Sequence, residues 1–139
     1  MMSPQTEGKP IPIPKQADRL LRDYPGSAIC RQTTESLVWQ GNVRPCPLSP
    51  TYYAELRYVL GRWPCVYVLA PALRSRAGRP PPHRYEDGSL CTFDSRLGHG
   101  EWKPWMWLSK TLLPWTQLWL FYYETWLATG VWSGAEVKH

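Results

Sequence analysis

The sequence contains no pair of cysteines with Cys-x-x-Cys spacing. Its four cysteines are spread along the chain, at Cys30, Cys46, Cys65 and Cys91. Structural zinc sites usually include at least one closely spaced pair. We therefore expect neither a metal nor another cofactor, and we read the cysteines as free thiols.

A long apolar run is also absent. Residues 1–15 lack the apolar stretch of a signal peptide. The most apolar window, residues 112–128, contains Gln117, Glu124 and a proline, and falls short of the roughly twenty apolar residues that a membrane span needs. We expect a cytoplasmic protein with reduced cysteines and no membrane partner.

Basic residues outnumber acidic ones, sixteen to eleven, which gives the 139-residue chain a net charge of +5. Much of the excess lies in Arg74, Arg76, Arg79 and Arg84. No aromatic side chain is interleaved among these arginines to stack on bases, so the pattern does not favour a nucleic-acid partner. An acidic protein surface or simple solubility explains it better.

Prolines and aromatic residues are abundant, with fifteen Pro, nine Trp and eight Tyr. This aromatic content is too high for a disordered chain, and the length fits one compact, loop-rich domain. Four prolines within residues 1–14 predict an extended N-terminal arm. We expect residues 15–139 to form the single domain.

Hydrophobic spacing predicts a short amphipathic helix over residues 15–24, ended by Pro25-Gly26. Four strands should follow in an antiparallel meander, at residues 28–33, 36–40, 51–59 and 65–70. The second should lead into a turn at Gly41-Asn42, and the uniform apolar run of the fourth is typical of a strand covered on both faces.

Residues 71–85 are rich in proline and predict a long irregular loop. The main helix should cover about residues 115–128, with Pro114 in its first turn and a stop at Gly130. One broad face of this helix should belong to the core, and it carries Trp115, Leu118, Trp119, Tyr122, Tyr123 and Trp126.

Cys91 is the cysteine best placed for chemistry. It follows the turn signal Asp87-Gly88, and His83 lies eight positions upstream. A turn of this kind should present a reactive thiol, which a neighbouring positive group or hydrogen-bond donor can activate. The other cysteines lie in predicted strands or, for Cys46, between two prolines.

Two motifs around Cys91 resemble the active-site segment of ubiquitin-conjugating enzymes. Gly88-Ser89-Leu90-Cys91 is similar to the family's Gly-x-Ile-Cys, and Trp102-Lys103-Pro104 to the Trp-x-Pro that follows it. The resemblance implies the α+β ubiquitin-conjugating-enzyme-like (UBC) fold. That fold has an N-terminal helix, a four-stranded antiparallel meander sheet, an active-site loop and a long C-terminal helix, here aromatic. It also implies that Cys91 forms a thioester.

The family's His-Pro-Asn motif reads Pro81-Pro82-His83 when counted back from Cys91, so His83 takes the position of the Asn. A two-residue deletion would instead equate His83 with the family's His. An imidazole there can donate a hydrogen bond to an oxyanion or accept the proton of an incoming amine. We therefore predict Cys91 and His83 as the catalytic residues.

Other residues should support this site. Within the active-site loop, Gly88 and Leu90 belong to the cysteine motif, and Tyr85 should pack the loop or line the path of the incoming tail. Trp102 and Pro104 should brace the segment beyond Cys91. We read Asp94, His99 and Glu101 as surface residues outside the chemical step.

The aromatic end from Trp119 to Gly130, with only a short tail after it, resembles bacterial relatives that accompany CBASS anti-phage systems. The resemblance implies a thioester with the C-terminal tail of a cyclic GMP-AMP synthase-like nucleotidyltransferase (CD-NTase). An amine on an acceptor protein or small molecule would then receive the acyl group, and an activating enzyme is a further candidate partner. Three alternatives remain: an inactive binding module of the same fold, a carrier for a bacterial ubiquitin-like protein, and a hydrolase with a Cys91-His83 dyad.

Overall fold

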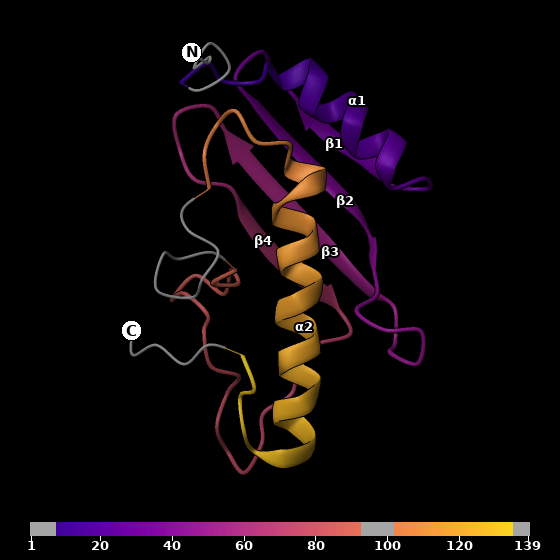
Figure 1. Cartoon of the computed structure of the whole chain (residues 1–139), viewed down its shortest axis with the longest axis vertical. Coiled ribbons are helices and arrows are strands. Elements are labelled where there is room, and N and C mark those ends of the chain that lie inside the picture. Colours follow the sequence, from indigo (N-terminus) through magenta and orange to yellow (C-terminus); the bar gives the residue numbers. More distant parts are fainter. Residues whose placement is uncertain (1–7, 93–101, 135–139) are drawn as a thin grey trace, which may run out of the picture.

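The computed structural model describes residues 8–92 and 102–134. In order, its elements are α1 (Ile13–Asp23), β1 (Ala28–Gln32), β2 (Ser36–Val43), β3 (Tyr52–Val59), β4 (Cys65–Ala70), the 3-10 helix η2 (Leu108–Lys110) and α2 (Leu112–Thr129). The strands form one antiparallel sheet in the order β1-β2-β3-β4. The predicted α+β arrangement, with one helix before a four-stranded meander and one after it, is confirmed. Figure 1 shows α2 crossing one face of the sheet, with α1 beside β1 and β2.

The core lies between the sheet and the two helices. In β3 the alternate residues Tyr52, Ala54, Leu56 and Tyr58 are buried, as the period-two pattern predicts. They form one hydrophobic cluster with buried side chains of both helices. Because the sheet covers only one side of α2, the other side of this apolar helix remains partly open.

The predicted core face of α2 is only partly right. Trp119, Tyr123 and Trp126 are buried, whereas Trp115, Leu118 and Tyr122 are half-buried. The buried face also includes Leu112, Leu113, Thr116 and Leu120. A helix that is apolar nearly all round gives no clear periodic signal, so its sequence could not fix which side meets the sheet.

Helix α1 begins at Ile13, two residues earlier than predicted. Pro12 is its N-cap residue and Pro14 lies in the first turn. Proline is compatible with this position because the first turn has no intrahelical acceptor for its missing N–H. The backbone N–H groups of Lys15 and Gln16 both donate to the Pro12 carbonyl oxygen, at 3.0 and 3.1 Å.

The turn predicted at Gly41-Asn42 is wrong, because β2 continues through it to Val43. Gly41 pairs with Ala54 of β3. A Cβ atom at Gly41 would lie 2.5 Å from Cζ2 of the Trp39 ring. Glycine is therefore required here by the close approach of an indole ring, not by a turn.

The expectation that the fourth strand is covered on both faces is also wrong. Strand β4 lies at an edge of the sheet, and Val66 is its only buried residue. Leu69 is 45% exposed. Apolar residues on the outer side of an edge strand look the same in sequence as those of a central strand.

The end of α2 is as predicted. Gly130 has a φ of +84°, and its N–H donates to the Trp126 carbonyl oxygen at 2.7 Å. The Arg76 guanidinium donates from Nε to the Leu127 carbonyl oxygen at 3.1 Å, which places a positive charge at the negative end of the helix dipole. No helix in the described part of the chain combines the length and apolar character needed to cross a bilayer.

Candidate active site

Residues 83–91 fold back on themselves as a hairpin that carries Cys91 at its end. We call this segment the Cys91 hairpin. The Gly88 N–H donates to the Tyr85 carbonyl oxygen and the Tyr85 N–H to the Ser89 carbonyl oxygen, both at 2.9 Å. Gly88 has a φ of +91°, a conformation that glycine adopts without strain. The turn predicted at Asp87-Gly88 is confirmed.

The tip of the hairpin is fixed by the Asp87 carboxylate. Its Oδ1 accepts hydrogen bonds from Ser89 N–H at 2.9 Å and Ser89 Oγ at 2.6 Å, and its Oδ2 accepts from the Tyr67 hydroxyl at 3.0 Å. The Ser89 side chain contributes most to lowering the pKa of Asp87, and the Ser89 N–H and Tyr67 add to it. Because Tyr67 belongs to β4, this contact ties the tip to the sheet.

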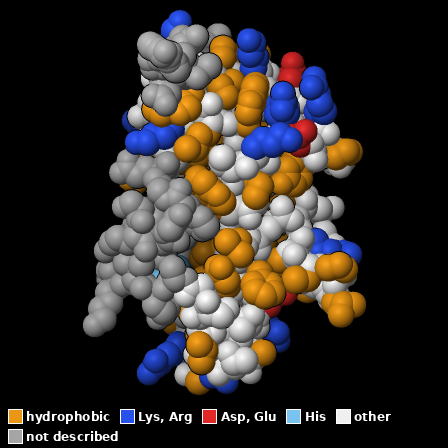
Figure 2. Space-filling view, in the orientation of Figure 1, with side chains coloured by type: hydrophobic (Ala, Val, Ile, Leu, Met, Phe, Trp, Pro, Cys, Tyr) orange, Lys and Arg blue, Asp and Glu red, His pale blue; other side chains and the backbone are white. Residues whose placement is uncertain are grey.

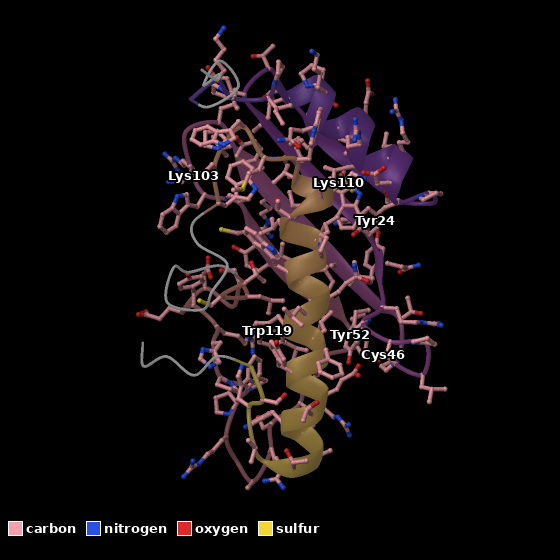
Figure 3. The ribbon with its side chains drawn as sticks, viewed as in Figure 1. Tyr24, Cys46, Tyr52, Lys103, Lys110 and Trp119 are labelled. Atoms are coloured by element: carbon pink, nitrogen blue, oxygen red, sulfur yellow. The ribbon has the colours of Figure 1, made fainter. Side chains whose placement is uncertain are left out.

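The base of the hairpin is anchored to both the sheet and the long helix. The Leu90 N–H donates to the Val66 carbonyl oxygen of β4 at 2.9 Å. The His83 carbonyl oxygen accepts from Cys91 N–H at 3.0 Å and from the Trp119 indole Nε1 at 2.9 Å. Figure 3 shows Trp119 on the side of α2 opposite to Tyr52 in this view. Two elements that are distant in sequence thus hold the position of Cys91.

The Cys91 thiol is not presented on the surface, contrary to the expectation from the turn. Cys91 is 3% exposed, whereas Cys30 is exposed and Cys46 is half-buried. Its Sγ donates to the Tyr85 hydroxyl oxygen at 3.4 Å, and Tyr85 itself is 46% exposed. A phenol can accept a hydrogen bond from a thiol and donate one to a thiolate, so Tyr85 can serve both forms of Cys91.

His83 meets Cys91 through its main chain. Its φ of +58° is unusual for a residue with a Cβ, and its ring packs on Trp132 with centroids 4.9 Å apart. Trp132 also packs edge-on against Trp119, at 5.3 Å. The imidazole therefore belongs to an aromatic cluster at the base of the hairpin.

Trp102 and Pro104 lie in the scaffold. Trp102 is buried, packs edge-on against Tyr58 at 5.1 Å, and donates from Nε1 to Thr111 Oγ1 at 3.1 Å. The Pro104 carbonyl oxygen accepts from the Ile11 N–H at 3.0 Å. These contacts join the segment after Cys91 to the core and to the start of the chain. Asp94, His99 and Glu101 lie outside the described residues.

The residues that anchor the hairpin could be predicted only in part from the sequence. Asp87-Gly88-Ser89 is a pattern in which an Asp side chain accepts from the N–H two positions on, so the Asp87–Ser89 contact was predictable. Tyr67 and Trp119 looked like ordinary strand and core residues. Their hydroxyl and indole N–H reach the hairpin only through tertiary packing.

Two arginines of the basic segment have structural roles. Arg76 binds the end of α2, and Arg84 donates from Nη2 to the Gly88 carbonyl oxygen at 3.4 Å. Figure 2 shows a separate gathering of Lys and Arg side chains over α1. The basic charge of this protein is therefore not concentrated beside Cys91 alone.

Comparison with protein families matches residues 16–139 to E2-CBASS, described as Type II CBASS E2 protein. No curated protein matches the chain significantly. The match covers most of α1, the whole sheet, the Cys91 hairpin and α2. Because this match extends over most of its length, the chain belongs to the family of type II CBASS E2 proteins.

Proposed function

We propose that this protein is a cysteine-dependent acyl transferase of anti-phage defence. Cys91 forms a thioester with the C-terminus of a cyclic GMP-AMP synthase-like nucleotidyltransferase and passes that acyl group to an amine. The observation that supports this most is the position of the cysteine of the Gly-Ser-Leu-Cys motif. It lies on a hairpin anchored to both β4 and α2, in a chain of the CBASS E2 family.

We also propose that the helix–meander–helix arrangement is the ubiquitin-conjugating-enzyme fold, in one domain that begins at α1. The order of the elements and the antiparallel sheet support this. In such a domain the sheet and the long helix serve as a fixed frame. The hairpin with the reactive residue is then attached to that frame at several points.

The proposed reaction has two steps. The Cys91 thiol gives its proton to a base, which can return it to a departing thiolate, and the Cys91 thiolate attacks the activated C-terminal carbonyl carbon. A C–S bond forms while the activating group leaves, either as AMP or as the thiol of an activating enzyme. An amine then attacks the thioester, the C–N bond forms, the C–S bond breaks, and Cys91 leaves as a thiolate. The proton of the amine passes to a base.

His83 is the proposed partner of Cys91 in the second step, as proton acceptor or as oxyanion donor. The two roles separate in the His83→Asn variant, which restores the family's Asn. An amide can donate to an oxyanion but cannot accept the proton of an amine near neutral pH. If His83→Asn still transfers the acyl group and His83→Ala does not, the result supports a role as oxyanion donor. If both variants lose the transfer, the result supports a role as proton acceptor.

Burial of Cys91 suits the storage of a thioester. A site with little access for water slows hydrolysis, while a bound amine can still attack when it is correctly placed. Burial also means that the acyl donor has to displace a covering group. Tyr85, half-exposed and in contact with Sγ, is such a group.

The test uses the full chain with a CBASS nucleotidyltransferase, with and without an activating enzyme, and ATP. The parent and a Cys46→Ser control should give an adduct of the two proteins that a thiol reductant cleaves. Cys91→Ser should give no reductant-sensitive adduct, because a serine ester resists thiols. A reducible adduct that persists in Cys91→Ala would place the chemistry on another residue.

The buried thiol is also the observation that favours a second candidate, a binding module without acyl transfer. In that case the nucleotidyltransferase should bind the parent and Cys91→Ala equally well, and no adduct should form with either. Binding measured by calorimetry beside the adduct assay separates the two functions.

A further inference from the structure

A groove of about 490 Å³ lies along the second half of α2, away from the Cys91 thiol. Apolar groups form its walls: Pro50 before β3, Pro71 and Ala72 after β4, and Leu127 and Ala128 of α2. Grooves of this size and composition hold small molecules when a few polar groups converge on them.

One of these polar groups is Glu124, the only charged residue of α2. Its Oε1 accepts from Ser49 Oγ at 2.7 Å and its Oε2 from the Tyr52 hydroxyl at 2.6 Å. No Lys or Arg of the described residues forms an ion pair with it. A carboxylate has about four acceptor positions, so two hydroxyl donors leave it able to bind a cation as well. In Figure 3 Tyr52 lies close beside α2, and its side chain lines this groove.

The second polar group is Arg74, which lines the same groove. Its backbone N–H donates to the Tyr123 hydroxyl at 2.7 Å, which fixes the main chain against α2. Burial and then Glu124 raise the pKa of Tyr52, whereas the positive charge of Arg74 opposes this effect.

A negative and a positive group therefore share one apolar groove without pairing with each other. A ligand with only a positive charge would be attracted by Glu124 but repelled by Arg74. A ligand with only a negative charge would be attracted by Arg74 but repelled by Glu124. The terminus of a peptide carries only one of the two charges. A free amino acid carries an ammonium and a carboxylate on one carbon atom, together with a side chain for the apolar walls.

We propose that this groove is a binding site for a free α-amino acid with an aliphatic side chain. Its ammonium group pairs with Glu124 and its carboxylate with Arg74. Its side chain packs against Pro71 and Leu127. The site is separate from Cys91, and the proposal does not depend on acyl transfer.

The test is a titration of the full-length, nitrogen-15-labelled protein, followed by NMR. L-leucine is compared with L-leucinamide, which lacks the carboxylate, and N-acetyl-L-leucine, which lacks the ammonium. Leucine should give saturable shifts of the Ala72, Leu127 and Ala128 amides. Each analogue should bind roughly tenfold more weakly, because each loses one charge-assisted contact.

Variants identify the residues. Arg74→Gln should reduce the affinity for leucine to about that for leucinamide, and Arg79→Gln, an exposed arginine of the same segment, should leave it unchanged. Glu124→Gln should reduce it to about that for N-acetyl-leucine. If that variant fails to fold, Ala128→Leu fills the groove from an exposed position and leaves Glu124 in place.

Three results would overturn the proposal. The first is the absence of saturable shifts at the groove amides with leucine. The second is equal affinity for leucine and either analogue, since one charge would then be irrelevant. The third is unchanged affinity in both Arg74→Gln and Ala128→Leu, which would place the bound amino acid elsewhere.

Discussion

The indole of Trp119 should control the stability of the backbone that carries Cys91. Its Nε1 donates to the His83 carbonyl oxygen at 2.9 Å, and the same oxygen accepts the Cys91 N–H. Trp119→Phe removes this donor and keeps an aromatic ring in the core. We expect it to loosen the base of the Cys91 hairpin beyond its effect on the fold as a whole.

The expected decrease in the free energy of unfolding is the sum of a lost hydrogen bond and lost packing. The hydrogen bond contributes about 1 kcal/mol, because the carbonyl of His83 keeps Cys91 N–H as a partner and is not left without a donor. The smaller ring leaves a gap beside Tyr123 and Trp132, which costs about 1–2 kcal/mol. Trp119→Phe should therefore lower the free energy of unfolding by ~2–3 kcal/mol.

Trp126→Phe is the matched control. Trp126 is 8% exposed and packs on Tyr123 of the same helix, but its indole makes no hydrogen bond to the hairpin in the described residues. Trp126→Phe should lower the free energy of unfolding only through the loss of packing. Urea unfolding measures the total, and hydrogen exchange measures local opening at the Cys91 amide. That amide should exchange roughly fivefold faster in Trp119→Phe than in Trp126→Phe, the equivalent of about 1 kcal/mol. Equal exchange in the two variants would refute the anchoring role.

Three further predictions concern the hairpin and one turn. Tyr85→Phe should slow alkylation of Cys91, followed by peptide mass spectrometry, about three- to tenfold because the ring can no longer donate to a thiolate; faster alkylation would mean that the hydroxyl only shields the sulfur. Gly130→Ala should lower Tm more than Gly61→Ala, by a few degrees at most: both have φ of +84°, but only at Gly130 would the new Cβ lie 2.7 Å from a guanidinium nitrogen, so the Arg76 side chain has to shift and its hydrogen bond to the Leu127 carbonyl oxygen weakens. The lowered pKa of Asp87 means that its contribution to stability is complete above about pH 4 and is lost as the pH falls through that lowered value. Asp87→Asn should therefore be less stable than the parent in urea at pH 7, and the difference should shrink as the pH falls below about 4; a difference that does not shrink would contradict the role of its charge.

Local sequence patterns were sufficient for most of the fold. The alternation from Tyr52 to Val59 predicted a strand with one buried face, and Gly130 predicted the end of α2, because each depends on residues a few positions apart. The predictions were wrong where contacts between residues outside the local pattern determine the structure. Gly41 looked like a turn residue, but the indole of Trp39 lies over it within a continuous strand.

The same distinction holds for the candidate site. The turn before Cys91 could be predicted from Asp87-Gly88-Ser89, since its hydrogen bonds are local. The burial of Cys91 could not, because burial depends on tertiary packing, and the contacts of the hairpin with β4 and α2 are not visible in the local sequence. Tyr67 and Trp119 contribute one polar atom each to that packing, and nothing in their sequence neighbourhood marks those atoms as functional.

The arrangement of the hairpin also indicates which part has to move when Cys91 reacts. Its main chain is held by hydrogen bonds within the turn, to Val66 and to Trp119, and breaking several of these together would cost several kcal/mol. The thiol–hydroxyl contact with Tyr85 is long and involves a weak donor, and the Tyr85 ring is half-exposed. Rotation of the Tyr85 side chain leaves these main-chain hydrogen bonds intact, whereas opening of the hairpin breaks them. We expect an acyl donor to reach Sγ by displacing Tyr85 while the backbone of Cys91 stays in place, which keeps the sulfur in a fixed position for both steps of the transfer.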